Sequence, residues 1–362
     1  MELQQLTTFL FILNFIFFLL LLVKISKKSR NTHSSSPLPP GPFKLPIIGH
    51  LHHLLGLPHH KLKDLAKKYG PIMYLKLGEV PTVVISSPGA AEQIMKKHDL
   101  KFVDRPDNAV INVVTYGYKD VVGAPYGDSW RRLRKICVLE LLSAKKVQSF
   151  WSLREEEVSK LVEKISLVAG SQINLSKMIF ALMNDITARA AFGKTCKDKE
   201  AFISVADYIL RMVAGFSFVD IFPSMKFFAT ISGTNSKIKM VHQTVNKILD
   251  EIIREHKENR METLKGEVEE DLMDVLLRIQ EAPELEIPIT MENIKAVIFD
   301  MFIAGTDTTS TLVEWTMIEL LRNPSVMEKT QEEVRQVFNG KKKIDQADMD
   351  KLNYLSLQPF LF

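Results

Sequence analysis

The chain has 362 residues, of which 46% are hydrophobic and 25% charged, and its 47 basic and 43 acidic side chains give a formal net charge of +4. This is the composition of a folded globular domain, and so small a positive excess does not indicate a nucleic-acid-binding protein. Two cysteines are too few for a disulfide framework, which fits a domain in the reducing cytosol.

An apolar run from Leu6 to Val23 opens the chain, and four basic residues follow it between positions 24 and 30. About eighteen residues is near the length that a helix needs to cross a bilayer. Because flanking positive charge stays cytosolic, we expect residues 1–23 to be a membrane anchor and the rest of the chain to face the cytosol. A cleaved signal peptide is the alternative, but the run lacks a basic segment before it and a small-residue cleavage site after it.

Residues 24–45 read as a linker that is first basic and then rich in proline. Its end, Pro37-Leu38-Pro39-Pro40-Gly41-Pro42, favours an extended polyproline-like spacer that holds a domain at a fixed attitude to a membrane. We therefore expect the globular domain to occupy residues 46–362.

The first predicted elements of the domain are two helices with a hairpin between them. Gly70-Pro71 ends the first helix, and Ser87-Pro88 begins the second. Histidines cluster between positions 50 and 60, but their spacing matches no metal-ligand pattern, so we expect them to be solvated. The predicted elements are a helix over His59–Tyr69, strands over Ile72–Leu77 and Thr82–Ser86 around a turn at 78–81, and a helix over Gly89–Lys97.

Residues 108–122 show no clean period, so we predict a loop that lines a cavity. The next helix begins near Trp130, and Arg134 lies one turn later on the same face. An indole N–H and a guanidinium that point the same way suit an anionic ligand. The alternative is a basic helix face that is solvated or paired with acids.

From residue 151 to residue 321 the pattern is almost entirely helical, which makes the predicted fold mainly α with small β-sheets (α+β). The segment 201–228 carries six phenylalanines. They indicate core packing, a patch that dips into a membrane, or the roof of an apolar pocket. The predicted helices are Leu153–Val168, Leu175–Phe192, Ile238–Glu258 and Asp271–Gln280.

The longest predicted helix runs from Thr290 to Leu321. Thr290 is a helix-capping residue, Glu292 places negative charge in the first turn, and Asn323-Pro324 supplies the stop. Apolar residues surround the first half of this helix, so we expect that half to be buried on every side.

Ala304-Gly305 then leaves a bare patch of backbone, followed by Asp307 and Thr308. One interpretation is close packing of another helix against the small residues, with the threonines bonded back to carbonyls one turn earlier. The other is a gap in which a planar cofactor and a small ligand approach the backbone, beside an acid and a hydroxyl that manage protons.

These features, in this order, resemble a microsomal cytochrome P-450. The resemblance is carried by the anchor, Pro-Pro-Gly-Pro, Trp-x-x-x-Arg and Ala-Gly-Thr-Asp-Thr-Thr, and it covers residues 1 to 355. Three further stretches are similar to the plant A-type group of these heme-thiolate monooxygenases: Phe-Val-Asp-Arg-Pro at 102–106, Tyr-Gly-Asp-Ser-Trp at 126–130 and Glu-Leu-Leu-Ser at 140–143.

The resemblance implies an enzyme that uses O2 and heme b to oxidise a hydrophobic small molecule, and terpenoids are one class of substrate that it suggests. It also implies electrons from an NADPH-cytochrome reductase and a single-pass position in the endoplasmic reticulum membrane. Six residues receive roles by resemblance: Trp130 and Arg134 at the heme propionates, Ala304 and Gly305 at the oxygen-binding groove, and Asp307 and Thr308 in proton delivery.

The cysteine that ligates heme iron in this family lies beyond Phe362 in the family pattern, so no metal ligand is assigned here. Cys137 and Cys196 stand in other contexts of the pattern. Residues 358–362 match nothing in it. We therefore expect a C-terminally truncated monooxygenase in which heme binding is impaired and activity is small. The alternative is a membrane-anchored, non-catalytic remnant that binds lipophiles or a reductase.

Overall fold

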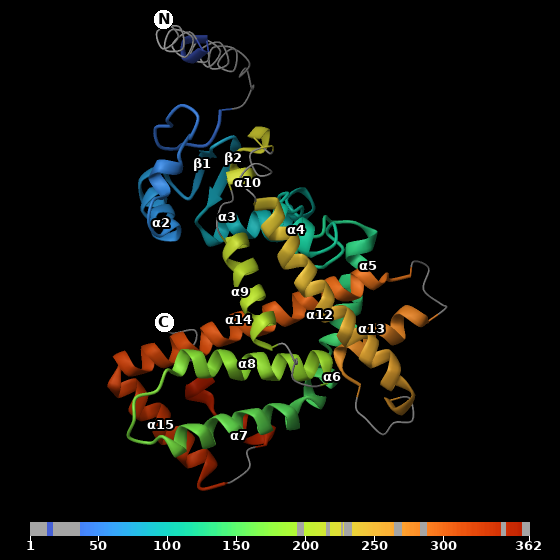
Figure 1. Ribbon diagram of the computed structural model, residues 1–362. Coiled ribbons are helices and arrows are strands. Elements are labelled where there is room, and N and C mark those ends of the chain that lie inside the picture. The colour runs from blue at the N-terminus through green and yellow to red at the C-terminus, as the bar shows by residue number, and fades with distance from the viewer. Residues whose placement is uncertain are drawn as a thin grey trace, which may run out of the picture. The chain divides into compact units, whose positions relative to one another are not determined.

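The computed structural model describes residues 13–16, 37–193, 199–214, 218–225, 227, 234–263, 270–282, 288–341 and 345–356 (Figure 1). The chain divides into two compact units. Unit 1 comprises residues Met1–Val103 and Phe218–Phe228, and unit 2 comprises Asp104–Ser217 and Ala229–Phe362. Most of the expected anchor and of the linker after it, Cys196, and residues 358–362 lie outside the described residues.

Unit 1 is built on a hairpin, as predicted. Its strands are antiparallel, with Ile72 opposite Ile85 and Leu77 opposite Val80. The connection is shorter than the predicted four residues, because the second strand already begins at Val80. Pro81 thus lies within a strand, which a two-stranded sheet tolerates at its edge. The elements are α2 (Pro58–Tyr69), β1 (Ile72–Leu77), β2 (Val80–Ile85), α3 (Pro88–Glu92) and α10 (Phe218–Ile221), with short 3-10 or π turns at Leu51–Leu54, Gln93–Lys97, Asp99–Lys101 and Pro223–Met225.

The hairpin turn joins the two separate segments of unit 1. Gly78 has a φ of +61°, and a Cβ at this position would collide with Ile221, so only glycine fits both the backbone and the space. Next to it, the Glu79 N–H donates to the Ile221 carbonyl at 2.9 Å. The Glu79 carboxylate accepts from the Ser224 N–H at 2.9 Å and from the Ser224 hydroxyl at 2.5 Å.

Unit 2 is helical in its described part. The predicted loop at 108–122 is wrong in part: Asn108 caps a short helix by accepting from the N–H groups of Val110 and Ile111, at 3.0 and 2.9 Å. The Asn108 cap stabilises the start of this helix, and the apolar pattern alone did not predict it. The helices are α4 (Ala109–Val114), α5 (Asp128–Ile136), α6 (Ala144–Ser149), α7 (Trp151–Leu167), α8 (Leu175–Phe192), α9 (Lys199–Ala214), α12 (Thr234–Thr263), α13 (Leu272–Glu281), α14 (Met291–Arg322), α15 (Pro324–Phe338) and α16 (Gln346–Met349), with a π turn at Cys137–Leu141.

The core of unit 2 forms around the first half of α14. Thr290 caps this helix and Asn293 completes a capping box, so the predicted start is confirmed. Helix α8 lies alongside α14, and α7 alongside α8 (Figure 1). Aromatic rings fill the centre of the core. They belong to Phe192, Phe202, Phe299 and Phe302, all at most 2% exposed and in edge or stacked contact.

The phenylalanine-rich segment has both buried and exposed rings, so the predicted core packing holds for only part of it. Phe202 and Phe222 are buried, whereas Phe218 and Phe227 are 52% and 58% exposed. Phe216 and Phe228 lie outside the described residues. By length and composition, Phe202–Ile221 is the one segment in the described chain that could cross a membrane. Phe202 and Ile209 at its start belong to the core of unit 2, which is also where an apolar helix of a soluble domain would lie.

Candidate functional site

The middle of α14 has one open face made of small residues. Ala304, Gly305 and Thr308 are exposed there, whereas Thr306 and Ser310 on the opposite face are buried. Further along the open face, Leu312 and Trp315 are 50% and 59% exposed. We call Ala304, Gly305, Thr308, Leu312 and Trp315 the open strip of α14. A flat ligand could reach the helix backbone along it.

Gly305 also allows close helix packing. A Cβ built at this position would lie 3.3 Å from the Thr187 hydroxyl oxygen of α8, tighter than an ordinary contact. The two interpretations of Ala304-Gly305 therefore each find support, since one side of Gly305 meets α8 while the residue as a whole remains exposed.

The hydroxyl groups on α14 bond back along the helix. The Thr308 hydroxyl donates to the Ala304 carbonyl at 2.6 Å, and the Ser310 hydroxyl to the Thr306 carbonyl at 2.8 Å. The Thr306 hydroxyl is buried without a partner in the described chain. Asp307 is half-buried, and its carboxylate makes no hydrogen bond with the described residues. The Thr308 hydroxyl of the open strip thus has an acid next to it in the sequence, Asp307, whose carboxylate forms no hydrogen bond with the described residues.

Trp130 and Arg134 lie together on α5, as their spacing predicts. The Arg134 guanidinium sits over the indole, 5.3 Å from the ring centroid, and the residue is exposed. The indole N–H donates to the Val121 carbonyl at 3.0 Å. Arg134 forms no ion pair within the described part of the chain, so its N–H groups can receive an anion. The opposite face of α5 carries Arg132, two of whose guanidinium nitrogens are buried without a partner there.

Two acidic residues that were not predicted from the sequence, Asp120 and Asp300, lie close to the Val121 carbonyl that Trp130 binds. Asp120 is fully buried, and its Oδ2 accepts from the Gly123 N–H at 2.6 Å. Asp300, on α14 one turn before Ala304, accepts from the N–H groups of Val121 and Val122. Burial raises the pKa of Asp300 to about 7, and the negative charge of Asp120 adds to this rise. Burial also raises the pKa of Asp120. The sequence signal for this site was the presence of an acidic residue, Asp300, in the apolar first half of α14.

Cys137 is not suited to bind a metal. The residue is 3% exposed, and burial raises the pKa of its thiol to about 12, with the charge of Asp300 adding to the shift. Because metals bind the thiolate, a thiol that stays protonated is a poor ligand.

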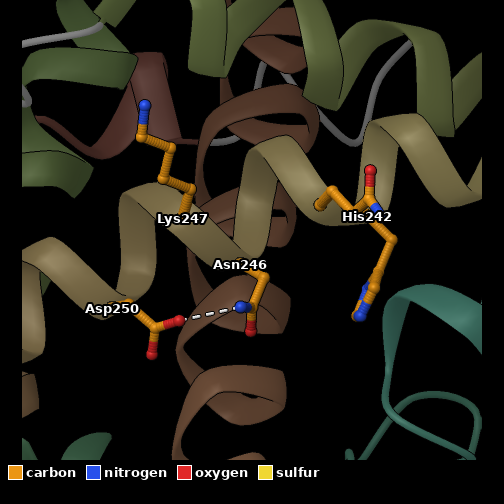
Figure 2. A pocket seen from close by; sticks show the side chains of 5 residues that line it. His242, Asn246, Lys247 and Asp250 are labelled. Carbon is orange, nitrogen blue, oxygen red and sulfur yellow. Dashed lines mark hydrogen bonds between the residues drawn. The ribbon is translucent and has the colours of Figure 1, made fainter.

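A polar pocket of about 420 Å³ opens on α12, but it contains none of the predicted site residues. His242, Asn246, Lys247 and Asp250 line it together with Gln243 (Figure 2). Beneath it, the buried Lys295 ammonium pairs with Asp250 and donates to Asn246 at 2.8 Å.

Tyr116 belongs to the same network. Its hydroxyl donates to Asn246 at 2.8 Å, and its ring meets the His242 ring edge-on. Among the buried polar side-chain atoms of this cluster, only a His242 nitrogen lacks a partner in the described chain, so we interpret the network as a support for the helices around it.

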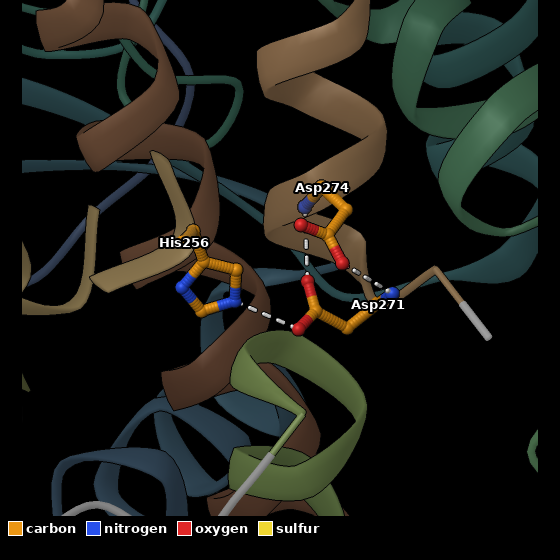
Figure 3. Close-up of side chains that lie close together, drawn as sticks. All are labelled: His256, Asp271 and Asp274. Carbon is orange, nitrogen blue, oxygen red and sulfur yellow. Dashed lines mark hydrogen bonds and ion pairs between the residues drawn. The ribbon is translucent and has the colours of Figure 1, made fainter. Parts of the chain in front are cut away.

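His256, Asp271 and Asp274 form a second polar cluster (Figure 3). Both imidazole nitrogens of His256 face acceptors, the Ile252 carbonyl at 2.7 Å and Asp271 at 2.8 Å, an arrangement that favours the doubly protonated, charged ring. Asp271 also caps α13 by accepting from the Asp274 N–H. The ligand atoms are thus already used in joining α12 to α13, and the cluster is a structural clamp. None of the histidines at positions 50–60 belongs to it.

Comparisons with known proteins point to one family. The family model described as Cytochrome P450 matches residues 39–357. Desmethyl-deoxy-podophyllotoxin synthase of Sinopodophyllum hexandrum is 50% identical to the chain over 346 residues, which are 94% of this chain and 67% of that protein. Premnaspirodiene oxygenase of Hyoscyamus muticus is 45% identical over 94% of this chain and 69% of its own length. Tabersonine 16-hydroxylase 1 of Catharanthus roseus is 48% identical over 95% and 69%.

The fold has solved counterparts as well. A zebra fish cytochrome P450 solved with progesterone superposes with a TM-score of 0.68 at 22% identity, over 83% of this chain and 69% of that one. A second zebra fish structure, with abiraterone, gives the same TM-score and identity. At this identity the likeness concerns the fold alone.

Proposed function

The chain belongs to the cytochrome P450 family of heme-dependent monooxygenases, in its plant A-type group. From this premise we propose that it oxidises a hydrophobic small molecule of the terpenoid class, with O2 and with electrons from a reductase. The chain spans about two thirds of the length of these relatives. The observation that carries the proposal is the open strip of α14, where the exposed Ala304, Gly305 and Thr308 directly follow the buried first half of the helix.

The described residues fit the ring and the propionate groups of a heme, although none of them is assigned as its iron ligand. The open strip gives a flat ring system access to the backbone at Ala304 and Gly305, and the exposed Arg134 guanidinium, free of ion pairs within the described chain, suits a carboxylate. Arg134 and Trp130 would hold the propionate groups, with the indole N–H shared between Val121 and the ligand. Bound heme supplies the redox chemistry that activates O2.

Asp307 and Thr308 are proposed to manage protons. The Thr308 hydroxyl donates to the Ala304 carbonyl, which leaves its oxygen lone pairs to accept a proton donor from the side of the open strip. Asp307, whose carboxylate is uncommitted among the described residues, would pick up protons from solvent and pass them to that hydroxyl through water. Two protons are needed for each O2 that is split, so a relay that can be recharged from solvent suits the reaction.

The substrate class rests on the relatives and on apolar residues near the site. The relatives' names record an oxygenase for premnaspirodiene and a hydroxylase for tabersonine. The partly buried Val113 and Val121, in the segment 108–122, pack against the apolar core. We propose that this segment shapes a pocket for a hydrophobic substrate.

The proposed setting is the endoplasmic reticulum membrane. Residues 1–23 would form a single-pass anchor, residues 24–45 a basic and proline-rich linker, and residues 46–362 a monooxygenase domain in the cytosol. An NADPH-cytochrome reductase would supply electrons from the same membrane.

The test is turnover of the full chain in detergent or lipid with heme, a plant reductase and NADPH. Terpenoid and alkaloid substrates are offered in parallel, and products are identified by mass spectrometry. NADPH- and O2-dependent hydroxylation or epoxidation supports the proposal, even at the small yield that the sequence leads us to expect. Saturable binding of a lipophile with no NADPH-dependent product would instead favour the non-catalytic binding protein.

A further inference from the structure

The segment Lys119–Gly123, here called the hub loop, is tied to α14 through its backbone. The Asp300 Oδ2 accepts two hydrogen bonds, from the Val121 N–H at 3.0 Å and from the Val122 N–H at 3.2 Å. The Asn293 side chain donates to the Lys119 carbonyl at 2.9 Å. The hub loop is thus held by side chains that lie more than 170 residues further along the chain.

One peptide group of the hub loop links Asp300 to Trp130. The peptide between Val121 and Val122 accepts the Trp130 indole N–H at its carbonyl, at 3.0 Å, and donates its own N–H to Asp300. A peptide group is planar, and in the trans form its carbonyl and N–H point in opposite directions. A rotation of this plane moves the carbonyl and the N–H together, so the two hydrogen bonds are geometrically coupled.

We propose that Asp300 is a positioning residue that fixes the orientation of Trp130 through the Val121–Val122 peptide. A second N–H donor, that of Val121 in the preceding peptide, binds the same carboxylate oxygen, so the backbone on both sides of the Val121 Cα is held by Asp300. The proposal deepens the proposed function, because it concerns a side chain placed there at the heme propionates. Its central claim, the coupling of Asp300 to Trp130, needs no heme.

The charge of Asp300 adds to this coupling. A charged acceptor makes a stronger hydrogen bond than a neutral one and polarises the peptide, which strengthens the bond at the carbonyl. The groups that face Asp300 are Asp120 of the hub loop and the Cys137 thiol. With burial and Asp120 raising its pKa to about 7, Asp300 changes charge near neutral pH, and the Trp130 indole should report that change.

The experiment follows the three indole N–H groups of the full chain by NMR after labelling tryptophan with 15N, in detergent. Trp130→Phe assigns the resonance of interest, and Trp151 and Trp315 serve as internal controls. Asp300→Leu keeps the approximate shape but removes both acceptor oxygens. We expect this variant to shift the Trp130 resonance while the other two resonances stay in place. Solvent exchange of the Trp130 indole N–H should become about fivefold faster, which corresponds to the loss of one hydrogen bond.

Asp300→Asn provides the second arm, because it keeps a carbonyl acceptor and loses only the charge. In the parent chain the Trp130 resonance should move with pH around 7, and in Asp300→Asn this movement should be absent while the fold is kept. A Trp130 resonance that ignores Asp300→Leu overturns the proposal. Should Asp300→Leu unfold the chain, a parent resonance that does not titrate, or one that titrates equally in Asp300→Asn, overturns it too.

Heme titration of Trp130→Phe tests the proposed function separately. If this variant binds heme as the parent does, the assignment of Trp130 to the propionates fails, whereas the coupling to Asp300 stands or falls on the NMR result alone. Weaker heme binding by both Trp130→Phe and Asp300→Leu would join the two.

Discussion

The Thr308 hydroxyl and the Ala304 carbonyl are joined by a hydrogen bond of 2.6 Å on the exposed face of α14. In Thr308→Val the hydroxyl is lost and the shape is kept. We expect oxygen consumption to continue while less product forms, since protons no longer reach the site in order. The ratio of product to O2 consumed, measured with heme and reductase, checks this.

Thr316→Val is the matched control for that variant. The Thr316 hydroxyl makes the same type of bond, to the Leu312 carbonyl at 2.8 Å, more than two turns further along α14. Both variants should lose at most about 1 kcal/mol of stability. Equal coupling ratios in the two variants would remove Thr308 from the proton path.

Ala304→Leu places a large side chain on the open strip. Because Ala304 is exposed there, the new side chain should not harm packing, but it would stand where a flat ligand must lie. We expect heme binding to weaken at least tenfold, a difference of about 1.4 kcal/mol. Spectral titration with heme measures it, with Thr316→Leu as the control. Heme affinity equal to that of the parent would show that the ligand does not approach Ala304.

His256→Gln should destabilise unit 2 in a pH-dependent way. Burial lowers the pKa of His256, but the hydrogen bond and charge of Asp271 outweigh it, so the folded pKa lies above the ordinary 6.5. A raised pKa means that the charged ring stabilises the fold fully below pH 6.5 and that this contribution is lost as pH rises through the folded pKa. Breaking such a buried pair costs about 3 kcal/mol.

Urea unfolding of the parent and of His256→Gln between pH 5.5 and 9 tests this. Asp274, whose pKa is raised by burial, faces the same cluster. The difference between the two proteins should be largest at pH 5.5 and should shrink toward pH 9. A difference that grows with pH would show that the ring is neutral in the fold.

The Lys295–Asp250 pair should be asymmetric in its response to mutation. Lys295 is 7% exposed, whereas the Asp250 side chain is 54% exposed. Asp250→Ala leaves a buried ammonium with Asn246 as its remaining acceptor, and we expect a loss of about 1–2 kcal/mol, reduced by the exposure of the acid. Adding Lys295→Met removes the stranded charge. Thermal unfolding should show the double variant to be more stable than Asp250→Ala, and the opposite order would contradict a buried charge.

Local signals in the sequence located the elements well, because they act within a few residues. Thr290 and Pro324 set the bounds of α14 within one residue, and Gly70 ended α2 as predicted. Trp130 and Arg134 meet because a helix places i and i+4 on one face. The role of Asp300 could not be predicted, since its partners Val121 and Val122 lie 179 and 178 residues away and offer only backbone groups, which leave no trace in side-chain pattern.

The hydrogen bonds around Glu79 have a consequence for synthesis of the chain. Glu79 binds Ile221 and Ser224, so the hairpin of unit 1 is completed by a segment that comes after α4 to α9 of unit 2 in the sequence. A ribosome making this protein delivers the hairpin early and its covering strip much later. Until then Gly78 and its neighbours face water, and the N-terminal unit is finished only when the middle of the chain has been made.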